Sequence, residues 1–414
     1  MKRRFLFFFF CFNIINGFAQ CENGRYIDKI FSQTIRTKNI VYSRAKNSSG
    51  AMQNILMDVF EPKDDTTSGL RPLIIFEHGG AYWTGTKDYE SQIAMGEEFA
   101  KRGFVVSSAT YRLEASPLSL LFQDLMLKAV GRGVQDTKNL VRYFFNSARD
   151  SANPFRIDTT KIFLCGGSAG AFNVMHAVYL DSTDNLDPNW NSWLNQIGGV
   201  FGDYDFIDFG EKIFGVVNIN GALGDKSYLD NEHTAFLSVH NIWDPEIPFN
   251  RGRPYNIPTL MYVDGSNILH SKAQELNIYN PFYVIPDAGH TSYSSDFFGT
   301  VVQPFFDSTV WYMKNFFAYQ LGCNNVVSGI KTTTKQTLQT FPNPLLDDLY
   351  FKNVQQFIGQ NITITNITGE EVYNAIFTGK PISTKSIGLH SGIYIVQLSD
   401  KRTNTIHSGK IIVE

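Results

Sequence analysis

The sequence predicts an α/β fold built on a mostly parallel sheet, followed by a small all-β sandwich domain. From residue 73 onward, short apolar runs alternate with helical patterns, and one of these runs ends in a Gly-rich turn that opens a helix. Such alternation is typical of a parallel sheet with helices on both faces. After residue 340, strand patterns continue without helical patterns between them, which separates the second domain.

Eight segments are predicted as strands of the main sheet. The first two precede any helix and are expected to pair as an antiparallel hairpin at its edge. The predicted strands are residues 40–44, 53–60, 73–77, 103–110, 161–165, 213–219, 235–240 and 282–285, and the predicted helices are residues 91–102, 130–148, 169–180 and 303–319. Residues 181–210 and 250–280 interrupt the alternation, and we expect them to be long loops over the functional site.

The amino terminus has the pattern of a secretory signal. Basic residues 2–4 precede the apolar residues 5–12, and residues 17–19 form a small-x-small cleavage motif. Cleavage there leaves Gln20 as the first mature residue. A lipoprotein signal ending at Cys21 is the alternative, which the preceding glutamine disfavours. No later segment has the length and apolarity of a membrane span.

Composition and cysteine placement narrow the class of protein. Of the 414 residues, 18% are charged and 14% aromatic, and the formal net charge is −3, so a large core is possible and nothing indicates a nucleic-acid partner. Cys165 ends a predicted strand. Cys21 and Cys323 flank the α/β region, whose ends are expected to lie close together in an oxidising compartment. A Cys21–Cys323 disulfide is therefore our hypothesis.

The turn at residues 166–170, Gly-Gly-Ser-Ala-Gly, is the strongest functional signal. It lies between a predicted strand and a predicted helix, which is the arrangement of a nucleophile elbow. Glycines are needed there because the turn is strained and leaves no room for a Cβ. The motif predicts Ser168 as a nucleophile. The alternative is an ordinary Gly-rich turn with an incidental serine.

A serine nucleophile needs a base, and in this kind of fold the chain order is serine, acid, histidine. His290 follows the last predicted strand in a short Gly-containing loop and is the predicted base. His270 is the main alternative and is expected in one of the covering loops. His240 precedes the predicted acid, which is the wrong order, and His233 is the remaining candidate.

Asp244 is the predicted acid because it follows the strand before the last one. It would hold the imidazole in the required tautomer and stabilise the imidazolium. Glu246, in the same loop, and Asp264 are the alternatives. A further alternative for the Asp-Pro pair at 244–245 is a simple turn.

The loop after the third predicted strand is expected to form the oxyanion site. Its glycines let backbone amides face a developing negative charge, and loss of one such donor costs roughly 3 kcal/mol. The expected donors are the amides of Gly79, Gly80, Ala81 and Ala169. His78 is expected to brace the loop by hydrogen bonds. Tyr82 and Trp83 are candidates to line the substrate cleft, with a place in the core as the alternative.

Four motifs in this order resemble the carboxylesterase side of the α/β-hydrolase family, and most of all its acetyl xylan and feruloyl esterase-like branch. They are residues 78–80, 166–170, 244–248 and 289–290. The resemblance covers about residues 26–321 and implies the α/β-hydrolase fold and ester hydrolysis by a Ser-His-Asp triad. The family's third glycine after the histidine is Ala81 here, which retains the backbone donor but puts the local geometry in question. No ligand-spaced cluster predicts a metal, and no cofactor is expected.

The carboxy-terminal segment is similar to the C-terminal sorting domain of the type IX secretion system. The matching motifs are residues 341–344, 348–349, 365–369, 389–394 and 410–413. The resemblance implies recognition by that secretion machinery, a cell-surface or secreted location, and export through the periplasm of a Gram-negative bacterium. It implies no catalysis, and the predicted signal peptide agrees with it.

The predicted organisation is a signal peptide (1–19), a catalytic domain (20–323), a linker (324–339) and a sorting domain (340–414). The predicted function is that of a secreted serine carboxylic-ester hydrolase, acting on carbohydrate-linked acetyl or feruloyl esters or on short-chain esters. One alternative is a serine peptidase of the prolyl-oligopeptidase type, although the chain lacks a propeller-length amino-terminal domain. The other is a catalytically silent surface-binding protein on a hydrolase scaffold.

Overall fold

The computed structural model describes residues 17–413 except 182–183, 200–212, 231–233, 286–288, 292, 295–298, 304, 324–333, 339, 346, 353, 367–369 and 401–404. The chain divides into two compact units, Met1–Val326 and Val327–Glu414. Most of the predicted signal peptide, and the candidate base His233, lie outside the described residues.

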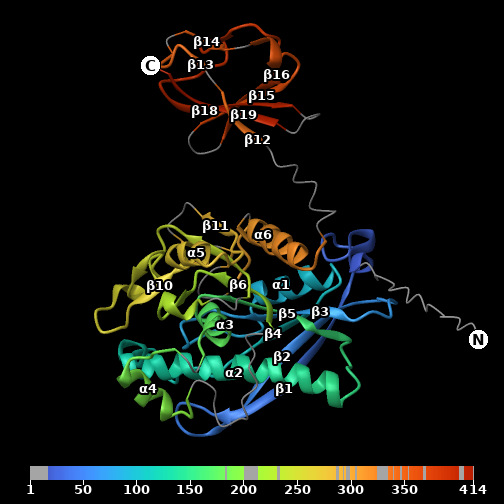
Figure 1. Cartoon of the computed structure of the whole chain (residues 1–414), viewed down its shortest axis with the longest axis vertical. Helices are drawn as coiled ribbons and strands as arrows, with labels where there is room; N and C mark the ends of the chain where they lie inside the picture. The colour runs from blue at the N-terminus through green and yellow to red at the C-terminus, as the bar shows by residue number, and fades with distance from the viewer. Residues whose placement is uncertain are drawn as a thin grey trace, which may run out of the picture. The chain divides into compact units, whose positions relative to one another are not determined.

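An eight-stranded sheet forms the centre of the first unit (Figure 1). Its order is β1-β2-β4-β3-β5-β6-β8-β11. The β1–β2 and β2–β4 pairs are antiparallel and all later pairs are parallel. The strands are β1 (Thr34–Lys46), β2 (Met52–Pro62), β3 (Arg71–Glu77), β4 (Val105–Ala109), β5 (Ile157–Gly167), β6 (Ile213–Ile219), β8 (Phe236–Asn241) and β11 (Phe282–Ile285). All eight predicted strands and the edge hairpin are confirmed.

Helices cover both faces of this sheet (Figure 1). The main ones are α1 (Glu90–Ala100), α2 (Gln123–Asp150), α3 (Ala169–Tyr179) and α6 (Phe305–Gln320). On β5, Phe163 packs against Phe317 of α6, while Leu164 belongs to the core shared with α2 and α3. Successive strand residues thus serve opposite faces. The α2 helix begins earlier than predicted because Met126 and Leu127 continue its apolar face.

The two stretches expected to be loops contain regular structure, so that expectation was wrong in part. Residues 181–210 include α4 (Pro188–Asn195), which Asp187 caps by accepting a hydrogen bond from the Asn189 amide, with proline at the first turn. Residues 250–280 include α5 (Ser266–Glu275) and two strands of a small sheet. Its strands are β7 (Ala222–Leu223), β10 (Val263–Gly265) and β9 (Arg251–Gly252).

The second unit is all-β in its described residues, apart from a short 3₁₀ turn, η6 (Val354–Phe357). One sheet has the order β12-β19-β18-β15-β16 and the other β13-β14-β17, and a single apolar core lies within the unit. The strands are β12 (Thr334–Thr337), β13 (Thr340–Phe341), β14 (Asp348–Phe351), β15 (Asn361–Asn366), β16 (Glu371–Ile376), β17 (Ile382–Ser383), β18 (Gly392–Asp400) and β19 (Thr405–Val413). The predicted small β domain is confirmed.

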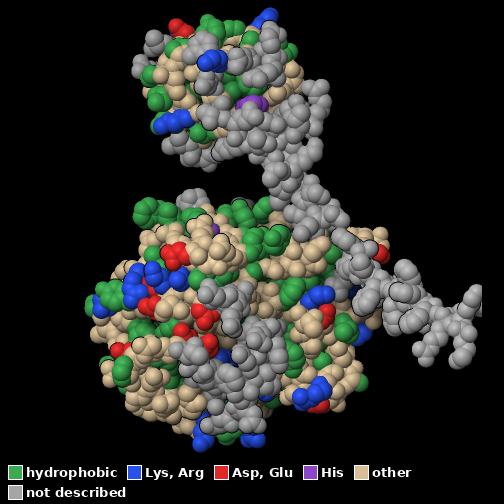
Figure 2. Space-filling view, viewed as in Figure 1, with side chains coloured by type: hydrophobic (Ala, Val, Ile, Leu, Met, Phe, Trp, Pro, Cys, Tyr) green, Lys and Arg blue, Asp and Glu red, His purple; other side chains and the backbone are tan. Residues whose placement is uncertain are grey.

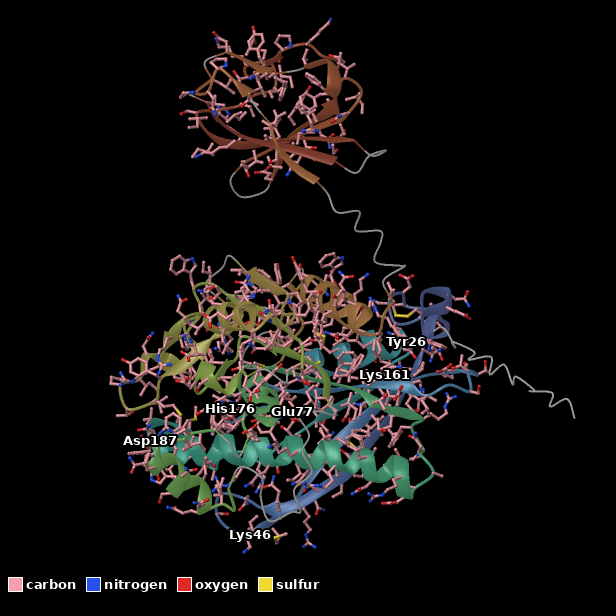
Figure 3. The ribbon with its side chains drawn as sticks, in the orientation of Figure 1. Tyr26, Lys46, Glu77, Lys161, His176 and Asp187 are labelled. Carbon is pink, nitrogen blue, oxygen red and sulfur yellow. A yellow bond between two sulfur atoms is a disulfide. The ribbon has the colours of Figure 1, made fainter. Side chains whose placement is uncertain are left out.

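A disulfide joins the two ends of the α/β unit. Cys21 in η1 (Gly17–Gly24) is bonded to Cys323, which follows α6, and the bond is drawn in yellow in Figure 3. This confirms the hypothesis drawn from the sequence. A cysteine in a disulfide has no thiol to carry a lipid, which argues against the lipoprotein alternative. Within the described residues, no helix combines the length and apolarity that a membrane crossing requires.

We predict that Cys21→Ser lowers the free energy of unfolding by about 2–5 kcal/mol, because the bond closes a loop of 302 residues in the unfolded chain. Thermal melts under non-reducing conditions measure this. The double variant Cys21→Ser/Cys323→Ser should have the same melting temperature as the single variant. Addition of a reductant should lower the melting temperature of the wild type only. Equal melting temperatures for wild type and single variant would contradict the prediction.

Candidate active site

Ser168 occupies a strained turn between β5 and α3. Its φ is 52° and its ψ −119°, a conformation that costs an L-residue about 1–3 kcal/mol. The Ser168 amide donates to the Ile219 carbonyl at 2.8 Å, which ties the turn to β6. A Cβ at Gly166 would lie 2.3 Å from the backbone of Gly170, so the first glycine of the motif has no room for a side chain. The hydroxyl therefore stands at the amino-terminal end of α3.

The loop after β3 lies directly against this turn. A Cβ at Gly79 would be 3.2 Å from the Ser168 Cβ, and one at Gly80, whose φ is +121°, would be 2.1 Å from the Thr84 carbonyl oxygen. Among the residues that the structure describes, none accepts a hydrogen bond from the amides of Gly79, Gly80 or Ala169. Polar donors without a protein acceptor beside a serine hydroxyl suit an oxyanion.

Ala81, at the position of the family's third glycine, has a φ of 50°. This left-handed conformation costs an alanine about 1–2 kcal/mol. The next residue, Tyr82, is left-handed as well, with a φ of 60°, and is buried. The loop thus keeps a tight turn without the glycine, held by side-chain contacts of its neighbours.

His78 braces this loop, as the sequence suggested. Its Nδ1 lies 2.7 Å from the Gly79 carbonyl oxygen, and its ring stacks on Tyr111 with a centroid distance of 4.4 Å. Burial lowers the pKa of His78 to about 4, which keeps the ring neutral. The Tyr111 hydroxyl also donates to the His78 carbonyl at 2.9 Å.

His290 and Asp244 lie in hydrogen-bond contact, with His290 Nδ1 2.7 Å from Asp244 Oδ2. The carboxylate also accepts bonds from the Asn220 side-chain amide at 2.6 Å and from the Glu246 and Ile247 backbone amides at 2.8 and 3.0 Å. Burial alone would raise the pKa of Asp244. Hydrogen bonds from His240, His290 and the backbone outweigh it and hold the pKa well below the usual range.

The alternatives drawn from the sequence have other partners. His270 lies on α5 rather than in a loop and contacts Asn280, with Nδ1 2.7 Å from its side-chain oxygen. Asp264 pairs with Arg251 at 2.8 Å. His240 is buried behind Asp244, with its Nε2 3.4 Å from Asp244 Oδ2, and acts as a second support of that carboxylate.

Glu246 was an alternative acid and has a different position from the one expected. Its Oε2 is 3.5 Å from His290 Nε2, on the opposite side of the imidazole ring from Asp244. The same oxygen accepts a hydrogen bond from the Tyr255 hydroxyl at 2.7 Å. Glu246 therefore borders the nitrogen that would exchange protons with substrate.

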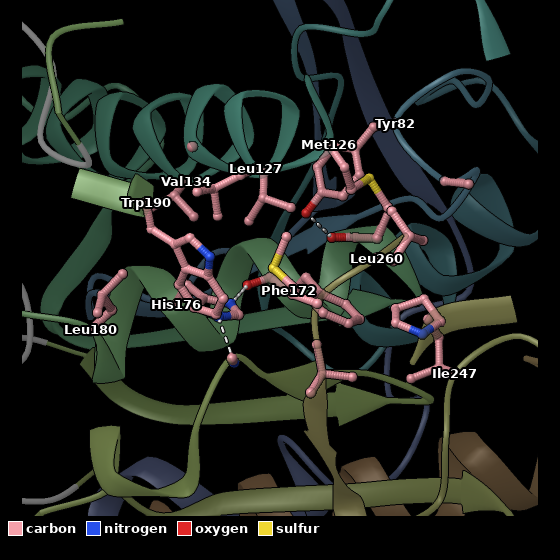
Figure 4. A pocket seen from close by; sticks show the side chains of 18 of the residues that line it. Tyr82, Met126, Leu127, Val134, Phe172, His176, Leu180, Trp190, Ile247 and Leu260 are labelled. Carbon is pink, nitrogen blue, oxygen red and sulfur yellow. Dashed lines mark hydrogen bonds between the residues drawn. The ribbon is translucent and has the colours of Figure 1, made fainter. Parts of the chain in front are cut away.

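Two cavities of contrasting character meet at Ser168. The polar one is also lined by Gly79, Gly80, Glu246 and His290. The other cavity is lined almost entirely by apolar side chains of α2, α3 and the covering segments, together with Ala81, Tyr82 and Ala169 (Figure 4). Trp83 lines neither of these two cavities and is 40% exposed.

Residues 57–212 match the family model BD-FAE, and residues 339–414 match the model of a secretion system C-terminal sorting domain. The strand order, the strained turn after β5 and the match of residues 57–212 all indicate the same fold. The chain has the α/β-hydrolase fold, followed by a domain of the sorting-domain family. The matched family supports an esterase-type hydrolase.

Two curated relatives are similar to part of this hydrolase. The isoprenylcysteine alpha-carbonyl methylesterase of Arabidopsis thaliana is 27% identical over 46% of the chain, and a probable enzyme of the same name from Oryza sativa subsp. japonica is 25% identical over 37%. The alignments span 37% and 32% of those proteins, about a third of their length.

Solved structures of similar fold include an esterase 2 of Thermogutta terrifontis phosphorylated by paraoxon, with a TM-score of 0.47 and 17% identity. That match covers 69% of this chain and 94% of the esterase. A truncated carbohydrate esterase from gut microbiota has a TM-score of 0.45 and 18% identity, covering 71% and 98%.

A buried polar network, which the sequence did not reveal, links the end of β3 and the loop after it to α2 and α3. Glu77, labelled in Figure 3, is 2.7 Å from the Thr137 hydroxyl and accepts from the Asn173 side-chain amide at 2.8 Å. Asn173 in turn accepts from the Tyr82 hydroxyl at 2.8 Å, and that hydroxyl also contacts the Ala169 carbonyl at 3.1 Å. Tyr82 thereby fastens the loop to α3.

Glu77 is protonated near neutral pH. Complete burial, reinforced by nearby Asp136, raises its pKa to about 8 against the hydrogen bonds from Asn173 and Thr137. The Thr137 hydroxyl lies within reach of both Glu77 and the Gly133 carbonyl oxygen, 3.0 Å away, but has one proton to donate. If Glu77 has a proton, Glu77 donates to the Thr137 hydroxyl and that hydroxyl donates to Gly133, so both contacts are hydrogen bonds.

The described residues bring no His, Cys, Asp or Glu cluster together that would hold a metal ion.

We predict that Glu77→Gln gains stability relative to wild type as the pH rises from about 5 to 8. The folded state keeps a proton on Glu77 that the unfolded chain loses near its ordinary pKa, so in this window ionisation of the unfolded state destabilises the wild-type fold. Gln cannot ionise and can donate to Thr137. Denaturant unfolding at several pH values measures the difference.

Glu275→Gln, on the exposed surface of α5, is the matched control and should follow the wild-type pH profile. A Glu77→Gln curve that runs parallel to wild type across the same window would show that Glu77 is ionised in the folded protein.

Proposed function

We propose that the chain is a secreted serine carboxylic-ester hydrolase in which Ser168, His290 and Asp244 form a catalytic triad. The observation that carries the proposal is the 2.7 Å contact between His290 and Asp244 at the edge of a cavity that also contains Ser168 and the Gly79–Gly80 amides. The esterase-type family match and the methylesterase relatives support ester chemistry.

The geometry fits a two-step acyl transfer. With His290 Nδ1–H donating to Asp244, Nε2 has the lone pair that accepts the Ser168 proton. Ser168 Oγ then attacks the ester carbonyl, and the Gly79, Gly80 and Ala169 amides bind the oxyanion. His290 gives the proton to the departing alkoxide. In the second step His290 takes a proton from a water molecule, whose oxygen attacks the acyl carbon. Ser168 Oγ then leaves with the proton from His290, and the free acid is released.

The alcohol side of the substrate corresponds to the polar cavity, because the leaving oxygen must be protonated by His290. That cavity is lined by hydroxyl, amide and carboxyl groups, among them Ser91, Gln92 and Glu246, and by Tyr89. Hydroxyl-rich alcohols such as sugars make hydrogen bonds with such groups. We therefore propose carbohydrate-linked acyl esters, acetyl or feruloyl esters among them, or short-chain esters, as substrates.

The second unit supplies export rather than catalysis. Its sorting-domain match indicates passage through type IX secretion, so the enzyme is a secreted or cell-surface protein. We propose that the signal peptide directs it first to the periplasm of a Gram-negative bacterium, and that residues 324–339 link the two domains.

We predict that Ser168→Ala lowers kcat for p-nitrophenyl acetate by at least about 1,000-fold, because the covalent step is lost. Initial rates of the purified full chain, with circular dichroism to confirm folding, measure this. Hydrolysis at the wild-type rate would rule the mechanism out.

Asp244→Asn is predicted to lower kcat by about 1,000- to 10,000-fold, because the amide favours the wrong imidazole tautomer. Glu246→Gln, a matched change on the other side of the ring, should lower it by less than about tenfold, because Glu246 touches Nε2 rather than Nδ1. If the larger loss came from Glu246→Gln, Glu246 rather than Asp244 would be the triad acid.

A further inference from the structure

The apolar cavity beside Ser168 follows the whole length of α3. Four of its lining residues, Ser168, Phe172, His176 and Leu180, are spaced four apart and so lie on one face of that helix. On the facing helix α2, Met126, Val130 and Val134 line the same cavity at the same spacing. A cavity that is lined by successive turns of α3 and by successive turns near the start of α2 is a groove elongated along the two helices.

The helix geometry sets its length. Twelve residues separate Ser168 from Leu180, which corresponds to about 18 Å along a helix. A helical side chain leans toward the amino terminus by roughly one turn, which is about 5 Å. The Leu180 side chain therefore closes the groove one turn before its own backbone position, and about 12 Å of length is available. Figure 4 agrees with this extension: Leu180 and Trp190 lie at one side of the cavity, and Tyr82 and Ile247 at the other.

Two polar side chains in the wall, His176 and Tyr82, are already bonded to protein. His176 Nδ1 is 2.8 Å from the Phe172 carbonyl oxygen, and its Nε2 accepts from the Gly224 amide at 3.0 Å. Burial lowers the pKa of His176 to about 4, so the ring is neutral. The Tyr82 hydroxyl is held by Ala169 and Asn173. Because these groups are satisfied, an occupant gains mainly apolar contact from this wall.

The position of His290 decides which part of the ester enters. His290 lines the polar cavity and not the apolar one, and the leaving alcohol must lie within its reach. The acyl group therefore extends into the apolar cavity. An acetyl group would fill only the part next to Ser168.

We propose that this cavity is an acyl-chain site for an extended, unsubstituted apolar acyl group of about eight to ten carbons. The length follows from the roughly 12 Å available and an advance of about 1.3 Å per carbon in an extended chain with C–C bonds near 1.5 Å. The assignment rests on the proposed function, and among the acyl esters proposed there it predicts a preference for longer aliphatic chains over acetyl.

The test is a chain-length series of p-nitrophenyl esters from acetate to dodecanoate, each below its aggregation concentration, with the full-length protein. The expected result is a rise in kcat/KM of about three- to fourfold per methylene up to eight to ten carbons, followed by a fall. A series that is highest at acetate or butanoate would overturn the proposal.

Two variants test the direction of the groove. Leu180→Phe adds bulk at its far end, and Val130→Phe adds it near the nucleophile, where Val130 packs with Phe172 and Tyr82. Leu180→Phe should lower the decanoate-to-butanoate ratio of kcat/KM at least tenfold. Val130→Phe should move the optimum to still shorter chains. Leu70→Phe, the same change at an exposed loop position, is the control. Equal ratios for Leu180→Phe and Leu70→Phe would contradict the assignment.

Two further measurements do not depend on how the variants fold. Decanoate should inhibit wild-type hydrolysis of p-nitrophenyl acetate at least 100-fold more strongly than butanoate, and equal inhibition would overturn the proposal. Methyl octanoate should exceed methyl ferulate in kcat/KM, and the reverse order would assign the groove to aromatic acyl groups. If Ser168-dependent acetate hydrolysis occurs without any gain with chain length, this inference alone fails. If no ester is hydrolysed, the proposed function fails.

Discussion

The site depends on one steric constraint, the approach of three backbone segments without intervening Cβ atoms at the carboxyl edge of the sheet. A Cβ at Gly170 would lie 2.5 Å from the Glu77 carbonyl, and the Gly79 position comes within 3.2 Å of Ser168. The ends of β3 and β5 and the start of α3 thereby occupy one small volume. The unfavourable φ of Ser168 is tolerated because the surrounding sheet and helix fix the turn.

Two buried carboxyl groups near this turn, Asp244 and Glu77, are held in opposite protonation states. Asp244 accepts hydrogen bonds from His290, Asn220 and two backbone amides, which favours its charged form. Glu77 has two polar neighbours and full burial, which favours its neutral form. The difference in donors, rather than in residue type, decides between them. The ionised group contacts the His290 imidazole, and the neutral one holds the loop after β3 through Asn173 and Tyr82.

The sequence was sufficient for features encoded by local pattern. Apolar runs and helical periodicity predicted the eight strands and four main helices, and the motifs around Ser168, Asp244 and His290 predicted residues that lie near one another. Features that depend on distant contacts were not predictable. Asn220, which follows β6, supports Asp244 from another segment, and nothing in its local sequence indicates this. The α4 and α5 helices lie in segments with weak periodicity. The Asp187 cap and the following proline were an available signal for α4, whereas α5 begins after Gly265 without a side-chain cap.

In the proposed mechanism, Ser168 is an activated nucleophile rather than an incidental residue of a binding scaffold. Reaction of the full chain with a fluorophosphonate probe, followed by peptide mapping, tests it most directly, because the probe reacts with activated serines and requires no knowledge of the substrate. We predict a single adduct on Ser168, which is absent after Ser168→Ala and slowed in Asp244→Asn. A folded protein that forms no adduct, or one that is labelled at another serine, would contradict the account.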